Sequence, residues 1–428
     1  MNIQMAGIDH TRADIREREA FTLTASALEA ALGEIAQQYP HRGCVIIATC
    51  NRTELYLSGR AEADPGPAEM LQALKGRAQD PAELPQDILV LRTGMDAVEH
   101  LFRLTCGLQS PIRGEHQILS QVKAALSVAR KAHATDSTLE RMFQMAIRCA
   151  KRVKTEAPIN RDNASIASVV VNRLRSYGEE QGLALAGLPC LVLGNGVVGR
   201  ETATHLARLG CGVTITQRRH HQGERPVPPG CEVLDYATRY DALRPYRVII
   251  SATVSPHYTL TWERLAPVWD GRPRLLLDLA MPRDIDPALR ALDALTLLDL
   301  DDLGRGVDST KVPDEGAVKT ILQEELRTFC QWHAFRPYAG RITAIQQAAA
   351  ADLLVRLNRP LKALALAPES ADYLHKTLSH ATYRVVGKLL FGLQETLPAQ
   401  HLDPCLTALE TLAGSSAPCP QYHRGDPL

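Results

Sequence analysis

The stretch Leu191-Val192-Leu193-Gly194-Asn195-Gly196-Val197-Val198-Gly199 decides the fold of the middle of this 428-residue chain. An apolar strand runs into a glycine-rich turn, a helical pattern follows to about Leu209, and a second strand occupies 213–216. This order is typical of a dinucleotide-binding fold, in which the glycines permit a tight turn, admit a pyrophosphate and let helix and strand pack closely. The helix N-terminus offers free N–H groups to the anion. We therefore predict a cofactor site at Gly194, Asn195, Gly196, Val197, Val198 and Gly199.

The residues after the second strand indicate which dinucleotide binds. NAD-dependent enzymes place an acidic residue here for the ribose hydroxyls, whereas this chain has Gln217-Arg218-Arg219-His220. An arginine at this position suits a 2′-phosphate, so we predict NADPH as the cofactor, bound partly by Arg218 and Arg219. Further apolar runs predict strands that complete a parallel sheet, at residues 248–250, 275–277 and 295–298.

A second stretch, Thr49-Cys50-Asn51-Arg52-Thr53-Glu54, follows the apolar run at 44–48, which predicts a buried strand. Cys50 is therefore expected where a strand ends and a loop begins. A thiol beside a cation such as Arg52 ionises more readily, and the thiolate is a nucleophile. The alternative is a small buried cysteine with a structural role, and the local sequence leaves both interpretations open.

The residues around these two motifs predict an α+β first region. Strands are expected at 3–8, 55–57 and 88–91, and a helix at 23–39. Two further helices flank a turn at Gly114, and they are rich in polar residues for a segment with so many Leu and Ile. These residues indicate either an ordinary polar surface or a pocket for a zwitterionic or hydroxylated ligand, and they include His100, Ser110, Glu115, Gln117 and Gln121.

The last third of the chain has a helical pattern throughout. A long helix is predicted at 318–335, and Ala- and Leu-rich helices at 342–412, with breaks at Pro360, Pro368 and Pro398. Apolar helices that follow two α/β regions often form an oligomer interface. A helical cap on the same chain is the alternative.

The composition excludes several classes of protein. Lys plus Arg equals Asp plus Glu at 48 each, which argues against a protein that binds nucleic acid by bulk charge. A local basic face is still possible, since residues 141–161 carry six basic side chains and one acidic one. The ten cysteines include no Cys-x-x-Cys pair, so we predict neither a zinc site nor a disulfide framework. No signal core or membrane span is evident, and a cytoplasmic protein is expected.

Several motifs together resemble those of the glutamyl-tRNA reductase family. The motifs span most of residues 1–335 in the family's order: Gly7-Ile8-Asp9-His10 with Arg18-Glu19, the Cys50 stretch, Gly107-Leu108-Gln109-Ser110, Gly114-Glu115-His116-Gln117-Ile118, Asn160-Arg161-Asp162 with Ser165-Ile166-Ala167, the glycine turn, 278–285 and 299–303. The resemblance implies NADPH-dependent reduction of glutamyl-tRNA to glutamate-1-semialdehyde, the first step of five-carbon tetrapyrrole synthesis.

The resemblance also implies roles for individual residues. Cys50 is the expected nucleophile and forms a thioester, and His100 is the expected proton-transfer group. In the substrate pocket, Arg52 would pair bidentately with the glutamate side chain and Glu115 would bind its α-ammonium. The full set of expected substrate-binding residues is Thr49, Asn51, Arg52, Ser110, Glu115, His116, Gln117 and Gln121.

The domains and partners follow from the same resemblance. We expect a catalytic domain at 1–157, an NADPH-binding Rossmann domain at 158–310, and a spinal helix with an all-helical dimerisation domain at 311–428. Glutamyl-tRNA is the expected substrate, a homodimer the expected assembly, and glutamate-1-semialdehyde aminomutase a further partner. No membrane association is expected.

Two other functions fit parts of the sequence. An ordinary NADP-dependent dehydrogenase would use only the Rossmann region and leave Cys50 structural. A diverged, non-catalytic paralogue that binds tRNA or a partner enzyme is the other alternative. The departures from the family pattern are Val197-Val198 in the glycine turn, Pro111-Ile112-Arg113 before Gly114, and Gln217, and they leave room for an altered paralogue with weak activity or a different acyl carrier.

Overall fold

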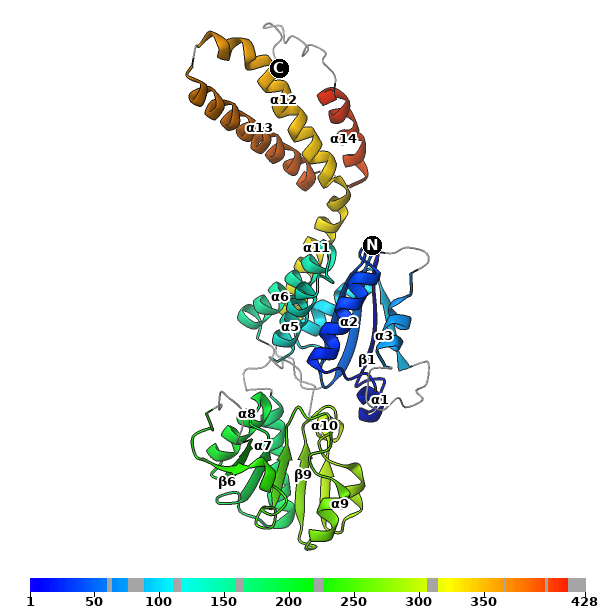
Figure 1. Ribbon diagram of the computed structural model, residues 1–428, viewed down its shortest axis with the longest axis vertical. Coiled ribbons are helices and arrows are strands. Elements are labelled where there is room, and N and C mark those ends of the chain that lie inside the picture. Colours follow the sequence, from blue (N-terminus) through cyan, green and yellow to red (C-terminus); the bar gives the residue numbers. More distant parts are fainter. Residues whose placement is uncertain are drawn as a thin grey trace. The chain divides into compact units, whose positions relative to one another are not determined.

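The computed structural model describes residues 1–59, 64–75, 88–110, 117–158, 165–218, 226–305, 315–364, 366–396 and 399–414. It divides into two compact units, Met1–Leu326 and Arg327–Leu428. The first unit contains two sheets, and the second is helical (Figure 1). The predicted order of an α+β part, a parallel-sheet part and a helical part is confirmed.

The α+β part is built on an antiparallel sheet with the order β2-β3-β1-β4. All seven residues of β3 are buried, so both faces of the sheet at this strand are covered by packed side chains. The elements are β1 (Ile3–Asp9), α1 (Ile15–Glu19), α2 (Ala25–Gln38), β2 (Gly43–Ala48), β3 (Arg52–Ser58), α3 (Pro67–Lys75), β4 (Val90–Thr93), α4 (Met95–Thr105), α5 (Gln117–Lys131) and α6 (Ser137–Glu156).

The second sheet is parallel, with the order β10-β9-β8-β5-β6-β7, which is the doubly wound Rossmann arrangement. The order reverses between β5 and β8, the position at which such sheets bind ligands. The elements are α7 (Ile166–Gln181), β5 (Pro189–Leu193), α8 (Val197–Arg208), β6 (Gly212–Gln217), β7 (Cys231–Asp235), η2 (Tyr236–Thr238), β8 (Val248–Ser251), α9 (Trp262–Leu265), η3 (Ala266–Val268), β9 (Arg274–Asp278), η4 (Pro287–Ala291), β10 (Leu295–Leu298) and α10 (Leu300–Arg305).

The two faces of the parallel sheet have separate cores. Cys190 and Val192 of β5 pack with α7, α8 and α10, whereas Leu191 and Leu193 pack with α9 and η4. Alternate residues of one strand point to opposite faces, and both faces are buried. This double burial explains the continuous apolar run that precedes the glycine turn.

Helix α11 (Glu315–Phe335) is the long helix predicted at 318–335, and it passes through the boundary between the two units. In the second unit, α12 (Ala339–Ala363) follows the turn η5 (Arg336–Tyr338) and lies between α13 (Pro368–Thr396) and α14 (Ala399–Gly414) (Figure 1). Their shared core contains Ile342, Ile345, Leu390, Leu402 and Leu406.

One predicted helix break is wrong. Pro360 lies inside α12, near its C-terminal end, and the helix continues to Ala363. A proline removes one backbone donor and crowds the preceding turn, but Pro360 is exposed and lies in the last turn of a long helix, where few further backbone bonds depend on it. Pro368 begins α13, as expected of a residue suited to the first helical position. Pro398 lies outside the described residues.

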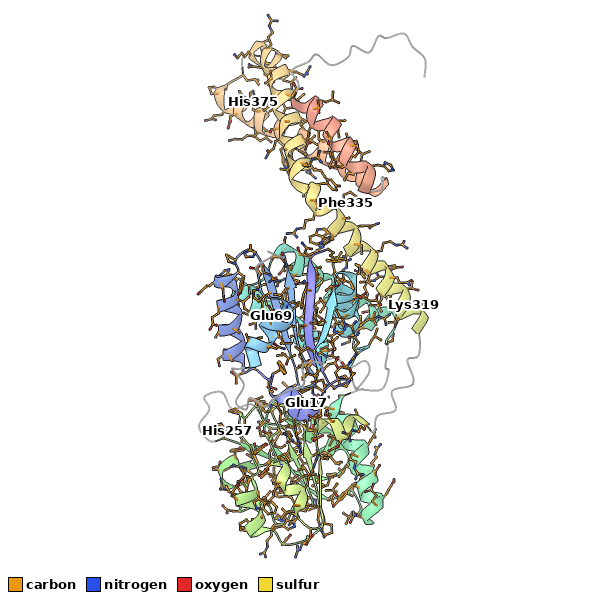
Figure 2. All side chains as sticks on the ribbon, turned by 90° about the vertical axis from the view of Figure 1, so that its right-hand side faces the viewer. Glu17, Glu69, His257, Lys319, Phe335 and His375 are labelled. Atoms are coloured by element: carbon orange, nitrogen blue, oxygen red, sulfur yellow. The ribbon has the colours of Figure 1, made fainter. Side chains whose placement is uncertain are left out.

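The short helix α1 joins the two sheets of the first unit. Figure 2 shows α1, marked by Glu17, between the side chains of the antiparallel-sheet part and those of the parallel-sheet part. Asp14 caps the helix and accepts hydrogen bonds from the N–H groups of Arg16 and Glu17, while the Glu17 carboxylate accepts one from the Asp14 N–H. This capping box holds five residues in a helix that is too short to be stable alone.

Candidate active site

Cys50 lies in the hairpin turn between β2 and β3. Ala48 faces Thr53 at the end of the ladder, and the Thr49 N–H donates to the Arg52 carbonyl at 2.8 Å. The Thr49 hydroxyl accepts hydrogen bonds from the N–H groups of Asn51 and Arg52, each at 3.2 Å. Cys50 itself is half-buried. The turn therefore holds the thiol at the end of a buried strand, as the sequence predicts, and Thr49 helps to form that turn.

The side chains of β3 that alternate from Arg52 form a buried polar cluster. The Arg52 guanidinium donates to Glu54 Oε1 at 2.8 Å, and His100 Nε2 lies 2.9 Å from the same oxygen. The Tyr56 hydroxyl donates to Glu54 Oε2 at 2.7 Å. His100 comes from α4, so one carboxylate joins the strand that follows Cys50 to a neighbouring helix. We name Arg52, Glu54, Tyr56 and His100 the Glu54 cluster.

The charge of Glu54 sets the protonation of its neighbours. Burial raises the pKa of Glu54, but the charges of His100 and Arg52 and the hydrogen bonds from His100 and Tyr56 lower it further, so the net pKa is well below its usual range. Burial and the Glu54 charge raise the pKa of Tyr56, which stays a donor. An ionised carboxylate only accepts hydrogen bonds, so His100 Nε2 carries a proton. In the neutral ring, Nδ1 is then the acceptor.

Gly7 makes room for this cluster. It faces Glu54 in the register of β1 and β3. A Cβ atom at Gly7 would lie 2.8 Å from Glu54 Cγ, closer than real Cβ contacts, so any larger residue would displace the carboxylate. Gly7 is therefore required for a steric reason, and the pairing of β1 with β3 is what shows it.

Arg52 also fixes the chain that follows α4. Its second terminal nitrogen donates to the carbonyl of Gln109, the residue before Ser110, at 2.5 Å. The Arg52 side chain is 2% exposed. The predicted bidentate pairing with a substrate carboxylate would therefore need a guanidinium whose terminal nitrogens are already bonded to protein. In this arrangement Arg52 holds the hairpin and the Gln109 loop together.

Some buried polar atoms around this region have no hydrogen-bond partner within the part of the chain that the structure describes. They are His10 Nδ1, His100 Nδ1, Gln109 Oε1 and Gln117 Nε2. Buried polar atoms are normally satisfied, so such a group of unsatisfied atoms is typical of a site that binds a polar ligand. Donors and acceptors both occur among them, as a zwitterionic amino acid requires.

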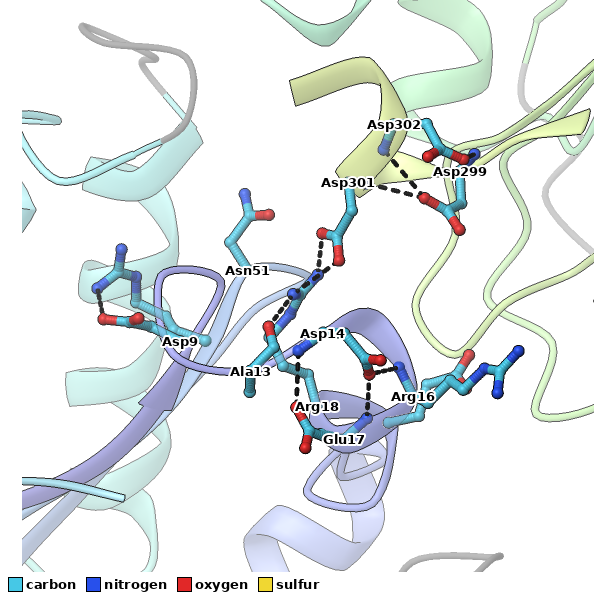
Figure 3. Close-up of polar contacts among 12 residues, drawn as sticks. Asp9, Ala13, Asp14, Arg16, Glu17, Arg18, Asn51, Asp299, Asp301 and Asp302 are labelled. Carbon is cyan, nitrogen blue, oxygen red and sulfur yellow. Dashed lines mark hydrogen bonds and ion pairs between the residues drawn. The ribbon is translucent and has the colours of Figure 1, made fainter. Parts of the chain in front are cut away.

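His10 connects the Cys50 turn to α1. The backbone N–H of His10 donates to the Asn51 carbonyl at 3.0 Å. Burial and then the Arg52 charge lower the pKa of His10 to about 4, and Asp9, Arg18 and Asp301 are also close enough to act on it. Figure 3 shows Asn51, Arg18 and Asp301 in this region, with Arg18 bonded to Asp301. Charged groups from α1 and α10 therefore lie close to the residue that holds the Cys50 turn.

The glycine turn has the geometry that a dinucleotide needs. Gly194 has φ +105°, and a Cβ there would lie 2.7 Å from the Ala252 carbonyl oxygen. A Cβ at Gly199 would overlap the Gly194 carbonyl oxygen. Helix α8 begins after Gly196 with no side-chain cap, so its first N–H groups are free to bind a phosphate. The residues therefore fit a pyrophosphate at the switch point of the sheet.

Arg218 follows β6 directly, next to the same edge of the sheet. Its guanidinium lies 4.9 Å from the centre of the Tyr236 ring. This is where the adenosine ribose of a bound dinucleotide lies in a Rossmann fold. Arg219 lies outside the described residues.

The structure thus brings together two groups of predicted residues. Thr49, Cys50, Asn51 and Arg52 share the hairpin, with His100 and Ser110 joined to it through Glu54 and Gln109. Gln117 and Gln121 lie one turn apart on α5, which packs on β2. Glu115 and His116 lie outside the described residues.

Sequence reasoning missed Glu54 and Tyr56 as site residues. The signal was the alternation of Arg52, Glu54 and Tyr56 with Thr53 and Leu55, which places three polar side chains on one face of a strand. A strand whose polar face is buried needs partners for those groups, and His100 is one of them.

A basic groove lies on the helix pair α5 and α6. These helices carry eight basic and two acidic side chains, in a chain whose charges balance. Lys123, Arg130, Arg148 and Lys151 line the groove. Arg130 pairs with Glu140 and Arg148 with Glu325, whereas the two lysines are exposed. Since α5 packs on β2, the groove belongs to the same part of the molecule as Cys50.

Two classes of feature are not found in the residues that the structure covers. No group of three or more His, Cys, Asp or Glu side chains in the described ranges could hold a metal ion. None of the helices described is long and apolar enough to cross a membrane.

Comparison with known proteins gives matches over both parts of the first unit. Residues 6–157 match the family described as the N-terminal domain of glutamyl-tRNAGlu reductase, and residues 179–305 match the shikimate/quinate 5-dehydrogenase family. The glutamyl-tRNA reductase of Acetivibrio thermocellus is 40% identical over 337 residues, which cover 78% of this chain and 98% of that protein. The glutamyl-tRNA reductase of Alkaliphilus oremlandii is 35% identical over 344 residues, which cover 80% of this chain and 100% of that protein. Among solved structures, glutamyl-tRNA reductase from Methanopyrus kandleri is 26% identical and covers 96% of this chain and 98% of its own, with a TM-score of 0.44.

Proposed function

The chain belongs to the glutamyl-tRNA reductase family, and from this premise we propose that Cys50 is the nucleophile of its reaction. The enzyme reduces the glutamyl group of glutamyl-tRNA to glutamate-1-semialdehyde, with release of the tRNA, as the first step of tetrapyrrole synthesis. The observation that carries the assignment of Cys50 is its place in a hydrogen-bonded turn beside a buried Arg–Glu–His cluster.

The proposed chemistry has two steps. Cys50 Sγ, as the thiolate, attacks the ester carbonyl; a C–S bond forms, the bond to the terminal ribose oxygen breaks, and that oxygen takes a proton as the tRNA leaves. A bound NADPH supplies the hydride for the second step. Cys50 then leaves the reduced carbon as a thiolate, which restores the enzyme and releases the aldehyde. Splitting the reduction in this way replaces one difficult step by two easier ones.

The Glu54 cluster supports a proton-transfer role for His100. Glu54 holds the proton on Nε2, so Nδ1 is the atom that can accept a proton from the thiol and return it to the ribose oxygen. The glutamate pocket is proposed to be lined by Thr49, Asn51, Ser110, Gln117 and Gln121. Glu115 and His116, which lie outside the described residues, are part of the same proposal.

A single-turnover assay with labelled glutamyl-tRNA tests this proposal. Without NADPH, a labelled adduct should form on Cys50; with NADPH, the label should appear as semialdehyde. An absence of both, in protein that binds NADPH, would contradict the thioester route and favour the diverged dehydrogenase or the binding protein.

Arg218 is proposed to select NADPH over NADH. Replacing it with Gln should raise the KM for NADPH roughly tenfold to a hundredfold and leave the KM for NADH nearly unchanged, because only the 2′-phosphate loses a charged partner. Steady-state kinetics with both cofactors measures the change. Arg239→Gln is the matched control, since Arg239 also lies over the Tyr236 ring but does not follow β6. Equal effects on both cofactors would contradict the assignment.

The groove on α5 and α6 is proposed to bind the phosphates of the tRNA. The double variant Lys123→Glu, Lys151→Glu should raise the KM for glutamyl-tRNA about tenfold at low salt and reduce the salt dependence of binding, with kcat little changed. Lys131→Glu, Lys154→Glu is the control with the same charge change on the same helices outside the groove. An equal loss in both double variants would mean that bulk charge acts instead of the groove.

Assembly and location are proposed from the family and from the helical unit. Val355, Tyr373, Val385 and Leu389 of α12 and α13 are exposed apolar side chains, which supports a homodimer formed through these helices. The three-domain division at 157 and 310, a cytoplasmic location and docking of the aminomutase are further parts of the proposal.

A further inference from the structure

Two adjacent residues of α1 bind the parallel-sheet part of the first unit. Arg18 donates to both oxygens of Asp301, at 3.2 and 2.7 Å. Glu19 accepts from the Arg283 N–H at 2.6 Å and from its guanidinium at 2.9 and 2.6 Å. Arg18 is basic and pairs with an acidic residue on α10, whereas Glu19 is acidic and pairs with a basic residue in the chain after β9. We name these two pairs the α1 clamp.

Burial makes the α1 clamp specific. The Arg18 side chain is 2% exposed and that of Arg283 is 9% exposed. Forked bonds between a guanidinium and a carboxylate are strong and directional, and a buried charge that loses its partner is costly. Since the two pairs have opposite polarity, sliding or rotating one surface on the other would oppose like charges. The α1 clamp therefore fixes one register of the two surfaces.

The Glu19–Arg283 pair of the α1 clamp is connected through neighbouring contacts to the glycine turn at Gly194. Arg283 precedes Asp284, which is fully buried and accepts bonds from Ser251, Thr253 and Thr259. Thr253 and Ala252 are the residues that a Cβ on Gly194 would meet. Asp278 holds the same loop through the N–H groups of Asp284 and Ile285. A continuous set of contacts thus joins Glu19 to the glycine turn.

The Arg18–Asp301 pair of the α1 clamp is connected to the turn that carries Cys50. Arg18 also donates to the Ala13 carbonyl at 2.8 Å, in the loop that carries His10. The backbone N–H of His10 donates to the carbonyl of Asn51, the residue after Cys50. Helix α1 therefore contacts both the edge of the sheet that carries the glycine turn and the loop that holds the turn carrying the thiol.

We propose that Arg18, Glu19, Arg283 and Asp301 are positioning residues for hydride transfer: the α1 clamp holds the cofactor site in register with the Cys50 thioester. This inference rests on the proposed function. Hydride transfer needs the reacting atoms at about 3 to 3.5 Å, and a misplacement of 1 Å can cost about a hundredfold in rate. Attack of Cys50 on the ester needs no cofactor, so loss of the bonds from Asp301 or Glu19 across the two parts should slow the second step only, while the Arg18–Ala13 bond beside the Cys50 turn remains.

The test separates the two steps in the full-length protein. Asp301→Asn and Glu19→Gln should leave the rate of adduct formation on Cys50 and the Kd for NADPH unchanged. Each should lower the single-turnover rate of semialdehyde formation roughly tenfold to a hundredfold. Asp302→Asn is the matched control, because Asp302 is on the same turn of α10 but pairs with Arg290 within the parallel-sheet part. It should reduce the thioester at the wild-type rate.

A charge exchange gives a second measurement. The variant Arg18→Asp, Asp301→Arg should reduce the thioester at least about five times faster than Arg18→Asp alone, because it restores an opposite-charge pair at the same place. Wild-type rates of reduction in Asp301→Asn and Glu19→Gln would overturn the inference, as would parallel losses of adduct formation and reduction. A wild-type enzyme that forms no adduct would instead overturn the proposed function.

Discussion

Replacing Cys50 with Ser should lower turnover of glutamyl-tRNA by about a thousandfold or more, because a serine hydroxyl is far less nucleophilic than a thiolate at neutral pH. No labelled adduct should form without NADPH. The substitution changes one atom in a half-buried turn, so NADPH affinity and thermal stability should stay close to those of the wild type. Single-turnover kinetics, an equilibrium titration with NADPH and a thermal unfolding curve measure the three quantities.

The control for this prediction is Cys231→Ser. Cys231 is also half-buried, but it begins β7 in the parallel-sheet part and has no place in the proposed chemistry. Its activity should equal that of the wild type. Normal turnover in Cys50→Ser would exclude the thioester and favour a dehydrogenase that uses only the Rossmann region.

The cofactor turn could be predicted from sequence because its physical requirements are local. Gly194 needs a positive φ and close approach to its neighbours, and Gly199 needs contact with the chain five residues earlier. These constraints act within one strand, turn and helix, so they appear as a motif of nine consecutive residues. The same reasoning explains why Cys50 was correctly expected at a strand end.

Edge strands and charges far apart in sequence could not be predicted in this way. Strand β7 (Cys231–Asp235) was missed because, among the strands that the structure describes, it pairs with β6 alone, and its residues Glu232 and Val233 are exposed, so no apolar alternation marks it. Arg18 and Asp301 are 283 residues apart, and only the fold brings them together. Their motifs were recognised as family features, but the bond between them has no local signal.

The Glu54 cluster could be predicted from the sequence only in part. Its strand residues are contiguous in a recognisable motif, whereas His100 is 46 residues from Glu54. The sequence resemblance suggested that Arg52 faces the substrate, but the structure directs its terminal nitrogens to Glu54 and Gln109. Predicting this needed the strand register, because side-chain partners on a buried face depend on which helix covers it.

Glu54→Gln should have the second-largest effect, and it should act on stability as well as on turnover. Glutamine keeps the shape of the side chain but removes the charge that faces Arg52 and His100. The Asp9 carboxylate also lies near Arg52, at 3.9 Å. Removing one partner of a buried ion pair costs about 3 to 5 kcal/mol, so we expect a clear fall in the unfolding temperature of the antiparallel-sheet part.

Turnover of Glu54→Gln should fall by about a hundredfold or more, because His100 loses the charged acceptor that holds its proton on Nε2 and stabilises the imidazolium. Adduct formation should slow, whereas NADPH binding should not change, since the Glu54 cluster lies outside the parallel-sheet part. Glu99→Gln is the control: Glu99 lies on the same helix as His100 and pairs with Arg103 at 2.7 Å, but both side chains are nearly half-exposed. Such a surface pair is worth about 1 kcal/mol or less. Adduct formation within threefold of the wild type in Glu54→Gln would show that Cys50 does not depend on the Glu54 cluster, and the basis for its activation would then have to lie in the turn alone.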